Sequence, residues 1–395
     1  GIWCGTHHDF FFATMMLLKE AGIDQIIGPD DLWTGEDGML EMLDRAEQFG
    51  ISVIPNLRGW DLNEVPAYAD HPALQGFLMW DEPSATDFDW LADAKEKFRS
   101  LMPEDKVFYV NLFPQPCSYE SLYGENYDSN AVNYETNYVD VFLRKVQPEQ
   151  LSVDYYPLME GNLIRPSYYQ NLETLAYRAK DNDIPLEVTV QNSGHDTTDG
   201  RYVSPSVQQL RWQMAVAMTY GASTLDHYIF TSHEETYAPM VDFNTLKPTE
   251  LFENAKTVDL ELRAWEDIYC SYRWLGSGKV DTAESNMMLL RLTKSLPQDQ
   301  WGVLSNIESD GDVIFGIFEN AYGENAYMIT NAGSTTEIPG KDYLANFEIN
   351  DANVCLQFNV ENCHYLKVIS GGESEYVKQS ADGAFQFTIP AYDGV

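Results

Sequence analysis

The sequence predicts an α/β fold: a (β/α)8 TIM barrel followed by a smaller antiparallel β-sandwich domain. Over residues 1–276, short apolar runs alternate with helical patterns eight times, which indicates a parallel sheet with helices on its outer side. From residue 277 onwards, short apolar runs are separated by Gly, Asn and Asp, a pattern typical of an antiparallel sandwich. We therefore expect a barrel domain at 1–276 and a sandwich domain at 277–395.

Each expected barrel unit is a short apolar strand followed by a helical pattern. The first helix ends at Gly22, a residue type that favours helix C-termini, and Thr86 is the expected N-cap of the helix after the fourth strand. A doubly wound sheet is the alternative, but no G-x-G-x-x-G motif follows the first strand. The expected strands are 2–5, 25–28, 51–57, 76–80, 107–112, 151–156, 186–191 and 224–230. The expected helices are 14–22, 38–49, 87–101, 134–146, 168–181, 204–220 and 248–265, with a short helix within 62–74.

No flexible linker precedes the second domain, so we expect this domain to pack against the barrel. Its expected strands are 287–292, 303–307, 313–318, 326–330, 354–358, 365–368 and 385–389. The five cysteines give no disulfide framework, because their number is odd and the chain is long. Cys355 and Cys363 would pair only if their strands were neighbours, and we expect core thiols instead.

The composition excludes several classes of partner. The chain has 24 Lys and Arg against 62 Asp and Glu, for a net charge of −38. Such a chain repels the phosphates of nucleic acids and anionic membranes. No apolar run reaches the length of about 18 residues that a membrane span needs. The 24 Tyr, 19 Phe and 9 Trp suit sugar binding, since flat rings stack on the C–H faces of pyranoses. The composition leaves the oligomeric state open.

Polar and aromatic residues follow the expected barrel strands. Active residues of barrel enzymes lie at the carboxyl ends of the strands. We expect these residues to bind substrate there: His7, Trp33, Asn56, Trp60, Asp81, Asn111, Tyr156, Gln191, His227 and Tyr228. The Tyr-rich segment 119–138 is long for a barrel connection, so we expect it to border the cleft or an interface.

Two adjacent carboxylates, Asp81 and Glu82, end the fourth strand in the run Trp80-Asp81-Glu82-Pro83. Strand alternation sends their side chains to opposite sides, so one would face the barrel mouth and the other would lie behind it. A glutamate near aromatic side chains acquires a raised pKa and can act as a general acid. The alternative is a loop acid that caps the next helix.

Residues 76–83, Gly-Phe-Leu-Met-Trp-Asp-Glu-Pro, resemble the strand-four motif of clan A barrel glycoside hydrolases, which include the family 42 β-galactosidases. Residues 212–224 and 242–253 resemble the segments around the last barrel strand of that clan. The resemblance covers about residues 1–275 and implies that Glu82 is the acid/base. It also implies a carbohydrate substrate and a secreted or cell-surface location. The chain opens directly in the apolar run of residues 1–5, from which we expect that the native N-terminus is trimmed.

The sequence departs from this clan at two positions. Asp81 stands where the clan usually has an Asn that binds the sugar 2-hydroxyl. Gln191 stands where the clan has its nucleophilic Glu, and glutamine cannot be that nucleophile. A carbohydrate-binding protein that has lost catalysis is therefore the second hypothesis, and another barrel enzyme, a lyase or a transglycosidase, is the third.

Hydrolysis of a glycosidic bond usually needs a second carboxyl group. We expect Asp154, at the end of the sixth strand, to be the catalytic partner of Glu82. A separation of about 5–5.5 Å would predict retention, and one of about 6.5–9.5 Å inversion. The alternative for Asp154 is a hydrogen bond to a loop or to a sugar hydroxyl. The other candidate partners are Asp81, Glu234, Glu235, Asp30 and Asp31.

Neither a metal nor a cofactor is expected. His7, His8 and Asp9 with His195 or His227 match no zinc motif such as H-E-x-x-H. The sequence also has no P-loop and no G-x-S-x-G motif.

Overall fold

The computed structural model describes residues 1–395 except residues 4–10, 29–35, 58–60, 116, 129–131, 199, 233 and 235. Packing divides the chain into two compact units. Residues 1–155, 181–195 and 224–256 form the first unit, and residues 156–180, 196–223 and 257–395 form the second. These units group segments by packing, so the expected domain boundary at residue 276 stays a prediction.

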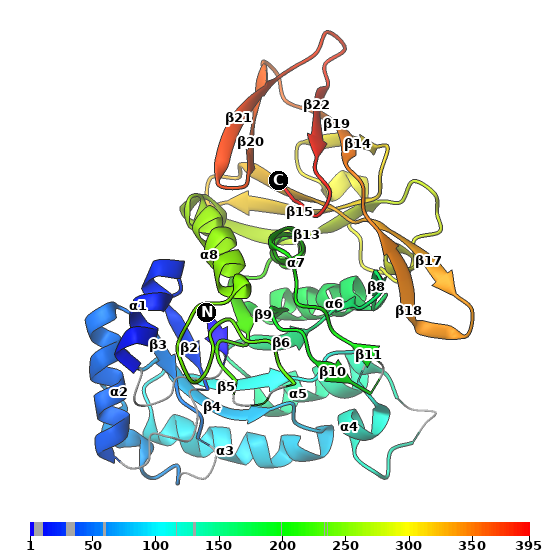
Figure 1. The fold of residues 1–395 in the computed structure, drawn as a ribbon. Coiled ribbons are helices and arrows are strands. Elements are labelled where there is room, and N and C mark those ends of the chain that lie inside the picture. Colours follow the sequence, from blue (N-terminus) through cyan, green and yellow to red (C-terminus); the bar gives the residue numbers. More distant parts are fainter. Residues whose placement is uncertain are drawn as a thin grey trace. The chain divides into compact units, whose positions relative to one another are not determined.

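The first unit is built on eight parallel strands that form a nearly closed barrel (Figure 1). The strand β1 pairs with β2 on one side and with β12 on the other, so the chain's first and last barrel strands are neighbours. Between β3 and β4 the barrel closes through a parallel bridge from Asn56 to Leu78. The strands are β1 (Ile2–Trp3), β2 (Gln25–Ile27), β3 (Ser52–Ile54), β4 (Gly76–Asp81), β5 (Val107–Leu112), β6 (Leu151–Tyr155), β9 (Leu186–Gln191) and β12 (Thr224–Tyr228).

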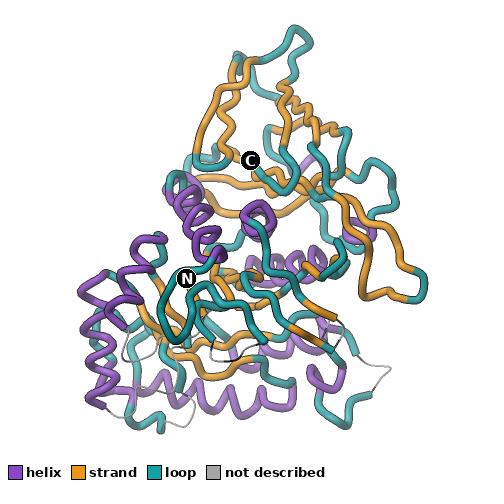
Figure 2. Tube along the Cα trace, viewed as in Figure 1, coloured by secondary structure: helices purple, strands orange, loops and turns teal. Residues whose placement is uncertain are grey.

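Helices alternate with these strands along the chain, as the sequence predicts (Figure 2). They are α1 (Phe11–Ala21), α2 (Glu36–Phe49), α3 (Phe88–Leu101), α4 (Tyr119–Tyr123), α5 (Asp140–Val146), α6 (Tyr168–Asp181), α7 (Val207–Thr219) and α8 (Glu250–Arg263). The helix expected at 134–146 begins as a π-helical turn, Tyr134–Val139, and continues as α5. Short 3-10 turns span Val65–Tyr68, Ala85–Asp87 and Gln298–Gln300.

The helix α3 shows how the barrel is covered. Its Phe98 ring lies edge-on to Phe77 of β4 at 6.4 Å and to Phe108 of β5 at 5.5 Å between centroids. All three side chains are buried, so the outward-facing residues of two neighbouring strands are packed under one helix. The expected N-cap Thr86 is not the cap. Instead, Ser84 and Asp87 form a capping box around the 3-10 turn that leads into α3.

The second unit contains the antiparallel sheets of the C-terminal region. One sheet has the order β13–β15–β16, another β14–β19–β22, and a third joins β17 and β18 to two short strands that follow β6 in the chain. The strands are β7 (Leu158–Met159), β8 (Leu163–Ile164), β10 (Asp196–Thr197), β11 (Gly200–Arg201), β13 (Tyr272–Val280), β14 (Leu304–Ser309), β15 (Val313–Asn320), β16 (Asn325–Asn331), β17 (Ser334–Ile338), β18 (Lys341–Glu348), β19 (Ala352–Phe358), β20 (Tyr365–Ser370), β21 (Glu373–Lys378) and β22 (Phe385–Ile389). A core that includes Phe315 of β15, Leu356 of β19 and Ile389 of β22 joins the first two sheets, as in a sandwich.

Two expectations for the C-terminal region are wrong. The run 287–292 was expected as a strand, but Met287–Leu290 is the short helix α10, which Asn286 caps; a second short helix, α9, spans Glu266–Cys270. An apolar run this short fits either a buried strand or a buried helix turn. Cys355 and Cys363 are free thiols that are partly exposed and not core residues.

Candidate active site

The last residues of strand β4 pair with β5 in an irregular register. Its pairing with β5 slips by one residue between Leu78 and Trp80, so that Trp80 lies opposite Val110 and Asp81 opposite Asn111. Paired residues share a face of the sheet, and this extra residue places Asp81 on the same side as Asn111. Trp80 takes the other side, where its ring lies 5.3 Å from that of Trp90 on α3.

Asn111 joins carboxyl groups from two strands. Its Nδ2 donates hydrogen bonds to Asp81 Oδ1 at 3.1 Å and to Asp154 Oδ1 at 2.8 Å. Asn111 is 1% exposed and half-buried Asp154 lies near the end of β6, so the ends of β4, β5 and β6 meet at this residue. Both amide hydrogens of Asn111 are engaged by carboxylates, so the residue expected to bind substrate holds the carboxyl groups in place.

Glu82 completes a cluster of three carboxyl groups. Burial raises its pKa to about 9, and the charges of Asp154 and Asp81 act in the same direction. Burial, together with the charge of Asp154, also raises the pKa of Asp81 to about 7, while the hydrogen bond from Asn111 lowers it. The Asp81 side chain is nevertheless exposed and that of Glu82 is half-buried.

The backbone at Glu82 is unusual. Its φ is +55°, in the left-handed region that non-glycine residues seldom adopt. Its N–H donates to the carbonyl of Asn111 at 2.9 Å, and the hydroxyl of the buried Tyr138 donates to the carbonyl of Pro83 at 2.7 Å. These contacts, with the Ser84 cap that follows, hold the strained residue. Strain of this kind is concentrated at functional sites. Left-handed φ at Glu82 and the slip in β4 also mean that simple alternation does not describe Asp81 and Glu82.

The remaining expected site residues lie on several elements. Tyr228 pairs with Gln191 on one face of the sheet, and Tyr228 packs against the apolar cluster that fills the barrel. His227 pairs with Val190, so it occupies the opposite face, and it is 1% exposed. Half-buried Asn56 forms the bridge that closes the barrel. In the second unit, Tyr156 packs edge-on against Tyr202 at 5.7 Å.

Several expected residues lie outside the described part of the chain: His7, His8, Asp9, Asp30, Asp31, Trp33, Trp60 and Glu235. Glu234 is exposed, and its N–H donates to Ser232 Oγ at 3.1 Å.

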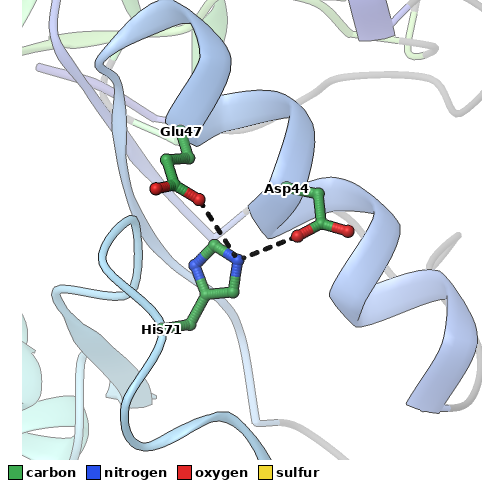
Figure 3. A group of neighbouring side chains, drawn as sticks. All are labelled: Asp44, Glu47 and His71. Carbon is green, nitrogen blue, oxygen red and sulfur yellow. Dashed lines mark hydrogen bonds and ion pairs between the residues drawn. The ribbon is translucent and has the colours of Figure 1, made fainter.

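One group of possible metal ligands occurs among the described residues: Asp44 and Glu47 of α2 with His71 (Figure 3). His71 Nε2 lies 3.2 Å from Asp44 Oδ1 and 3.9 Å from Glu47 Oε2. His71 Nδ1 accepts the N–H of Ala73 at 3.1 Å, which places the proton of the neutral ring on Nε2. A metal needs a lone pair on Nε2, so this geometry favours a hydrogen bond to Asp44 over a metal.

Sequence reasoning missed two features of this region. The sequence places Tyr138 in a Tyr-rich segment and does not indicate that its hydroxyl fixes the backbone beside Glu82. The sequence places Glu187 in an apolar strand, whereas its side chain is hydrogen-bonded inside the barrel. The alternation of Glu187, Thr189 and Gln191 along β9 is the signal that would have indicated a polar inner face.

Comparisons with known proteins find similarity of structure. No family model matches the sequence, and no curated protein matches it. Among solved structures, the β-galactosidase of the psychrophilic Marinomonas ef1 matches with a TM-score of 0.43 and 12% identity, over 68% of this chain and 60% of that one. The β-galactosidase of Halorubrum lacusprofundi matches with a TM-score of 0.47 and 10% identity, over 67% of this chain and 58% of that one. The chain therefore spans about three fifths of the length of these two proteins.

A third similar structure covers nearly the whole chain. The family 30 subfamily 8 xylanase of Clostridium acetobutylicum matches with a TM-score of 0.44 and 14% identity, over 99% of this chain and 93% of that one. These matches do not single out family 42. Among the described residues, no helix is both long and apolar enough to cross a membrane.

Proposed function

We propose that this protein is a glycoside hydrolase in which Glu82 is the general acid and Asp154 is its carboxylate partner. The observation behind this proposal is the meeting of Asp81, Glu82 and Asp154 around Asn111 at the carboxyl ends of β4, β5 and β6. That end of a barrel is where its enzymes carry out chemistry. Glycosidases use a protonated and an ionised carboxyl group that flank the scissile glycosidic bond.

The electrostatics of the cluster assign the two roles. Burial raises the pKa of Glu82 to about 9, and the charges of Asp154 and Asp81 act in the same direction, so Glu82 holds its proton at neutral pH. The hydrogen bond that Asn111 donates to Asp154 suits the carboxylate role that the proposal gives to Asp154. Glu82 then protonates the oxygen of the leaving sugar, and Asp154 attacks the anomeric carbon or activates a water molecule. Asp81 is the alternative partner, because it shares the same amide group.

Release of reducing sugar from a panel of oligo- and polysaccharides tests this proposal. Wild type is compared with Glu82→Gln, which keeps the shape of the side chain but has no acidic proton, and with Asp154→Asn. The exposed Glu96→Gln on α3 is the matched control. We expect each site variant to lose about 10²–10⁴-fold in rate, and the control to equal wild type. Hydrolysis that survives unchanged in Glu82→Gln would remove Glu82 from the mechanism.

A second candidate function is sugar binding without catalysis. It is motivated by Gln191, which is 1% exposed at the end of β9, where the clan that the sequence resembles has its nucleophilic Glu. Calorimetric titration with the same panel distinguishes the two functions. Binding of a glycan that wild type does not cleave would favour the binding protein, whereas turnover of any glycan would exclude it.

A further inference from the structure

Three tyrosines gather in the segment that follows β5, on α4 and just beyond it (Figure 1). The ring centroid of Tyr119 lies 6.2 Å from that of Tyr123 and 5.9 Å from that of Tyr127. The centroids of Tyr123 and Tyr127 are 6.5 Å apart, so each ring contacts the other two. We call these three residues the tyrosine cluster. Tyr119 is 51% exposed and Tyr127 is 37% exposed, so two of its rings meet solvent.

The helix α4 is fixed to the turn that follows β4, which gives the tyrosine cluster a defined place. Leu122 is 1% exposed and anchors the helix, and Ser118 caps its start. Gly124 ends the helix with a φ of +80°, and a Cβ at this position would lie only 3.1 Å from Thr86 Cγ2. Thr86 belongs to the 3-10 turn that leads into α3. The end of α4 therefore packs against the turn that begins just after Glu82.

Tyr134 connects the tyrosine cluster with the carboxyl groups. Its hydroxyl donates to the carbonyl of Phe113, just past β5, at 2.8 Å, and its ring stacks on that of Tyr138 at 5.6 Å. Burial raises the pKa of Tyr134 above its ordinary value, and the charges of Tyr123 and Asp154 are among those that raise it further. Such charges act from nearby. Tyr134 therefore lies close to the tyrosine cluster and also to Asp154.

Packing alone does not explain the tyrosine cluster. The hydroxyl of Tyr123 is buried, and it has no hydrogen-bond partner among the described residues. A buried hydroxyl without a partner costs free energy that a phenylalanine would avoid. Large aromatic side chains that group together at a surface mark a site of interaction. Tyrosine rings combine a flat apolar face with a polar edge, which suits the C–H faces and the hydroxyl groups of a sugar.

We propose that the tyrosine cluster is a subsite for a sugar unit away from the cleaved bond, so that the enzyme selects glycan chains over short ones. This inference rests on the proposed function, which supplies the substrate and the place of cleavage. The cluster follows β5 at the end of the barrel that carries the carboxyl groups. Thr86 is four residues from Glu82, and four residues span at most about 14 Å. A glycan of a few units covers that distance, and contacts remote from the reacting bond raise kcat/KM.

The dependence of hydrolysis on chain length tests the subsite. The ratio of kcat/KM for a hexasaccharide to that for the disaccharide is measured with the glycan that the panel identifies. We expect this ratio to be well above one in wild type. We expect Tyr119→Ala and Tyr127→Ala each to lower it about three- to tenfold, the effect of one aromatic contact. Tyr119→Phe keeps the ring and should retain most of the ratio. The control is Tyr322→Ala, at a tyrosine of the second unit that is 90% exposed, and it should match wild type.

Two kinetic results would overturn the proposal. A wild-type ratio near one would mean that no distant sugar unit contributes to binding. An equal loss on both substrates in Tyr119→Ala would mean that the cluster acts on the carboxyl groups and not on a sugar. Sedimentation of wild type and Tyr119→Ala covers the other occupant, a second copy of the chain. Weaker self-association of the variant with an unchanged ratio would make the cluster an interface between copies and would contradict the subsite.

Calorimetric titration tests binding without turnover. Glu82→Gln is titrated with each glycan of the panel, alone and combined with Tyr119→Ala. We expect the double variant to bind its best glycan about three- to tenfold more weakly. Equal affinity of the two proteins would contradict the subsite. If wild type cleaves no glycan, the proposed function fails, whereas this titration still decides whether the tyrosine cluster binds sugar.

Discussion

Glu82 differs from an ordinary surface glutamate in its backbone and in its electrostatic surroundings. Its φ is left-handed, and the Tyr138 hydroxyl donates to the carbonyl of Pro83, the next residue. Two neighbouring carboxyl groups oppose the ionisation of Glu82.

The position of active residues at strand ends is enough to predict that Glu82 and Asp154 lie at the same face of a barrel. The bridge through Asn111 could not be predicted, because side-chain orientation depends on a register slip that leaves no mark in the residue pattern.

The alkaline side of the pH–rate profile reports the proton on Glu82. The acid must be protonated, so the rate falls as pH rises through its raised pKa of about 9. Asp81→Asn removes one of the charges that raise this pKa, so we expect the alkaline limb to move to lower pH. The profile of kcat/KM for wild type and Asp81→Asn measures the shift. A limb that stays in place or moves to higher pH would contradict the assignment.

The same cluster makes stability depend on pH. The pKa values of Asp81 and Glu82 are raised in the folded protein, to about 7 and about 9, so the folded state binds more protons than the unfolded state above the ordinary carboxyl range. Stability contributed by these groups is therefore present at low pH and lost as pH rises through the raised values.

Asp154→Asn tests this dependence by relieving the repulsion. We expect its Tm to exceed that of wild type by roughly 2 °C at about pH 8 and by nothing at about pH 4, where Asp81 and Glu82 are protonated in either protein. Thermal melts of both proteins across this range measure the difference. A Tm gain of the same size at both pH values would indicate a cause other than charge.

At the scale of elements, β4 and the turn after it position the site. The extra residue between Leu78 and Trp80 places Asp81 on the same face as Asn111, and the capping box of Ser84 and Asp87 begins two residues after Glu82 and encloses the 3-10 turn that leads into α3. Element order follows from apolar periodicity and was predictable. The N-cap was misplaced at Thr86 because Ser84, Thr86 and Asp87 are all capping residue types and only geometry selects among them.

Removal of this cap should weaken the helix start. The Ser84 side chain accepts the N–H of Thr86, and its own N–H donates to Asp87 at 2.9 Å. We expect Ser84→Ala to lower the free energy of unfolding by about 1 kcal/mol. Urea denaturation measures this free energy for Ser84→Ala and for the control Glu96→Ala on α3. The control should change the free energy of unfolding by less than about 0.5 kcal/mol. Equal stability of both variants would show that the cap contributes nothing.

At the scale of the whole molecule, the barrel and the antiparallel region follow from two different periodicities in one chain. The eight barrel strands were predictable because each unit repeats the same local pattern. The pairing of β8 with β18 was not, since it joins residues Leu163 and Asn346 that lie far apart in the sequence. Local patterns carry no information on such non-local pairing, and neither β7 nor β8 has the length of an ordinary strand.

The net charge of −38 also acts on the whole molecule. Like charges repel most strongly in the compact state, and salt screens them over about 10 Å at 0.1 M. We expect the Tm to rise by a few degrees between about 10 mM and about 200 mM NaCl, and equally with KCl. Scanning calorimetry measures it. A Tm that falls with salt would mean that surface ion pairs outweigh the repulsion.

The most direct test of the central claim separates the two catalytic roles on one substrate. The glycan that the panel identifies is compared with its dinitrophenyl glycoside, whose leaving group needs no proton. The account predicts that Glu82→Gln loses hydrolysis of the glycan but retains that of the dinitrophenyl glycoside, while Asp154→Asn loses both. Equal loss of both substrates in Glu82→Gln, or full activity on both, would contradict Glu82 as the acid of this site.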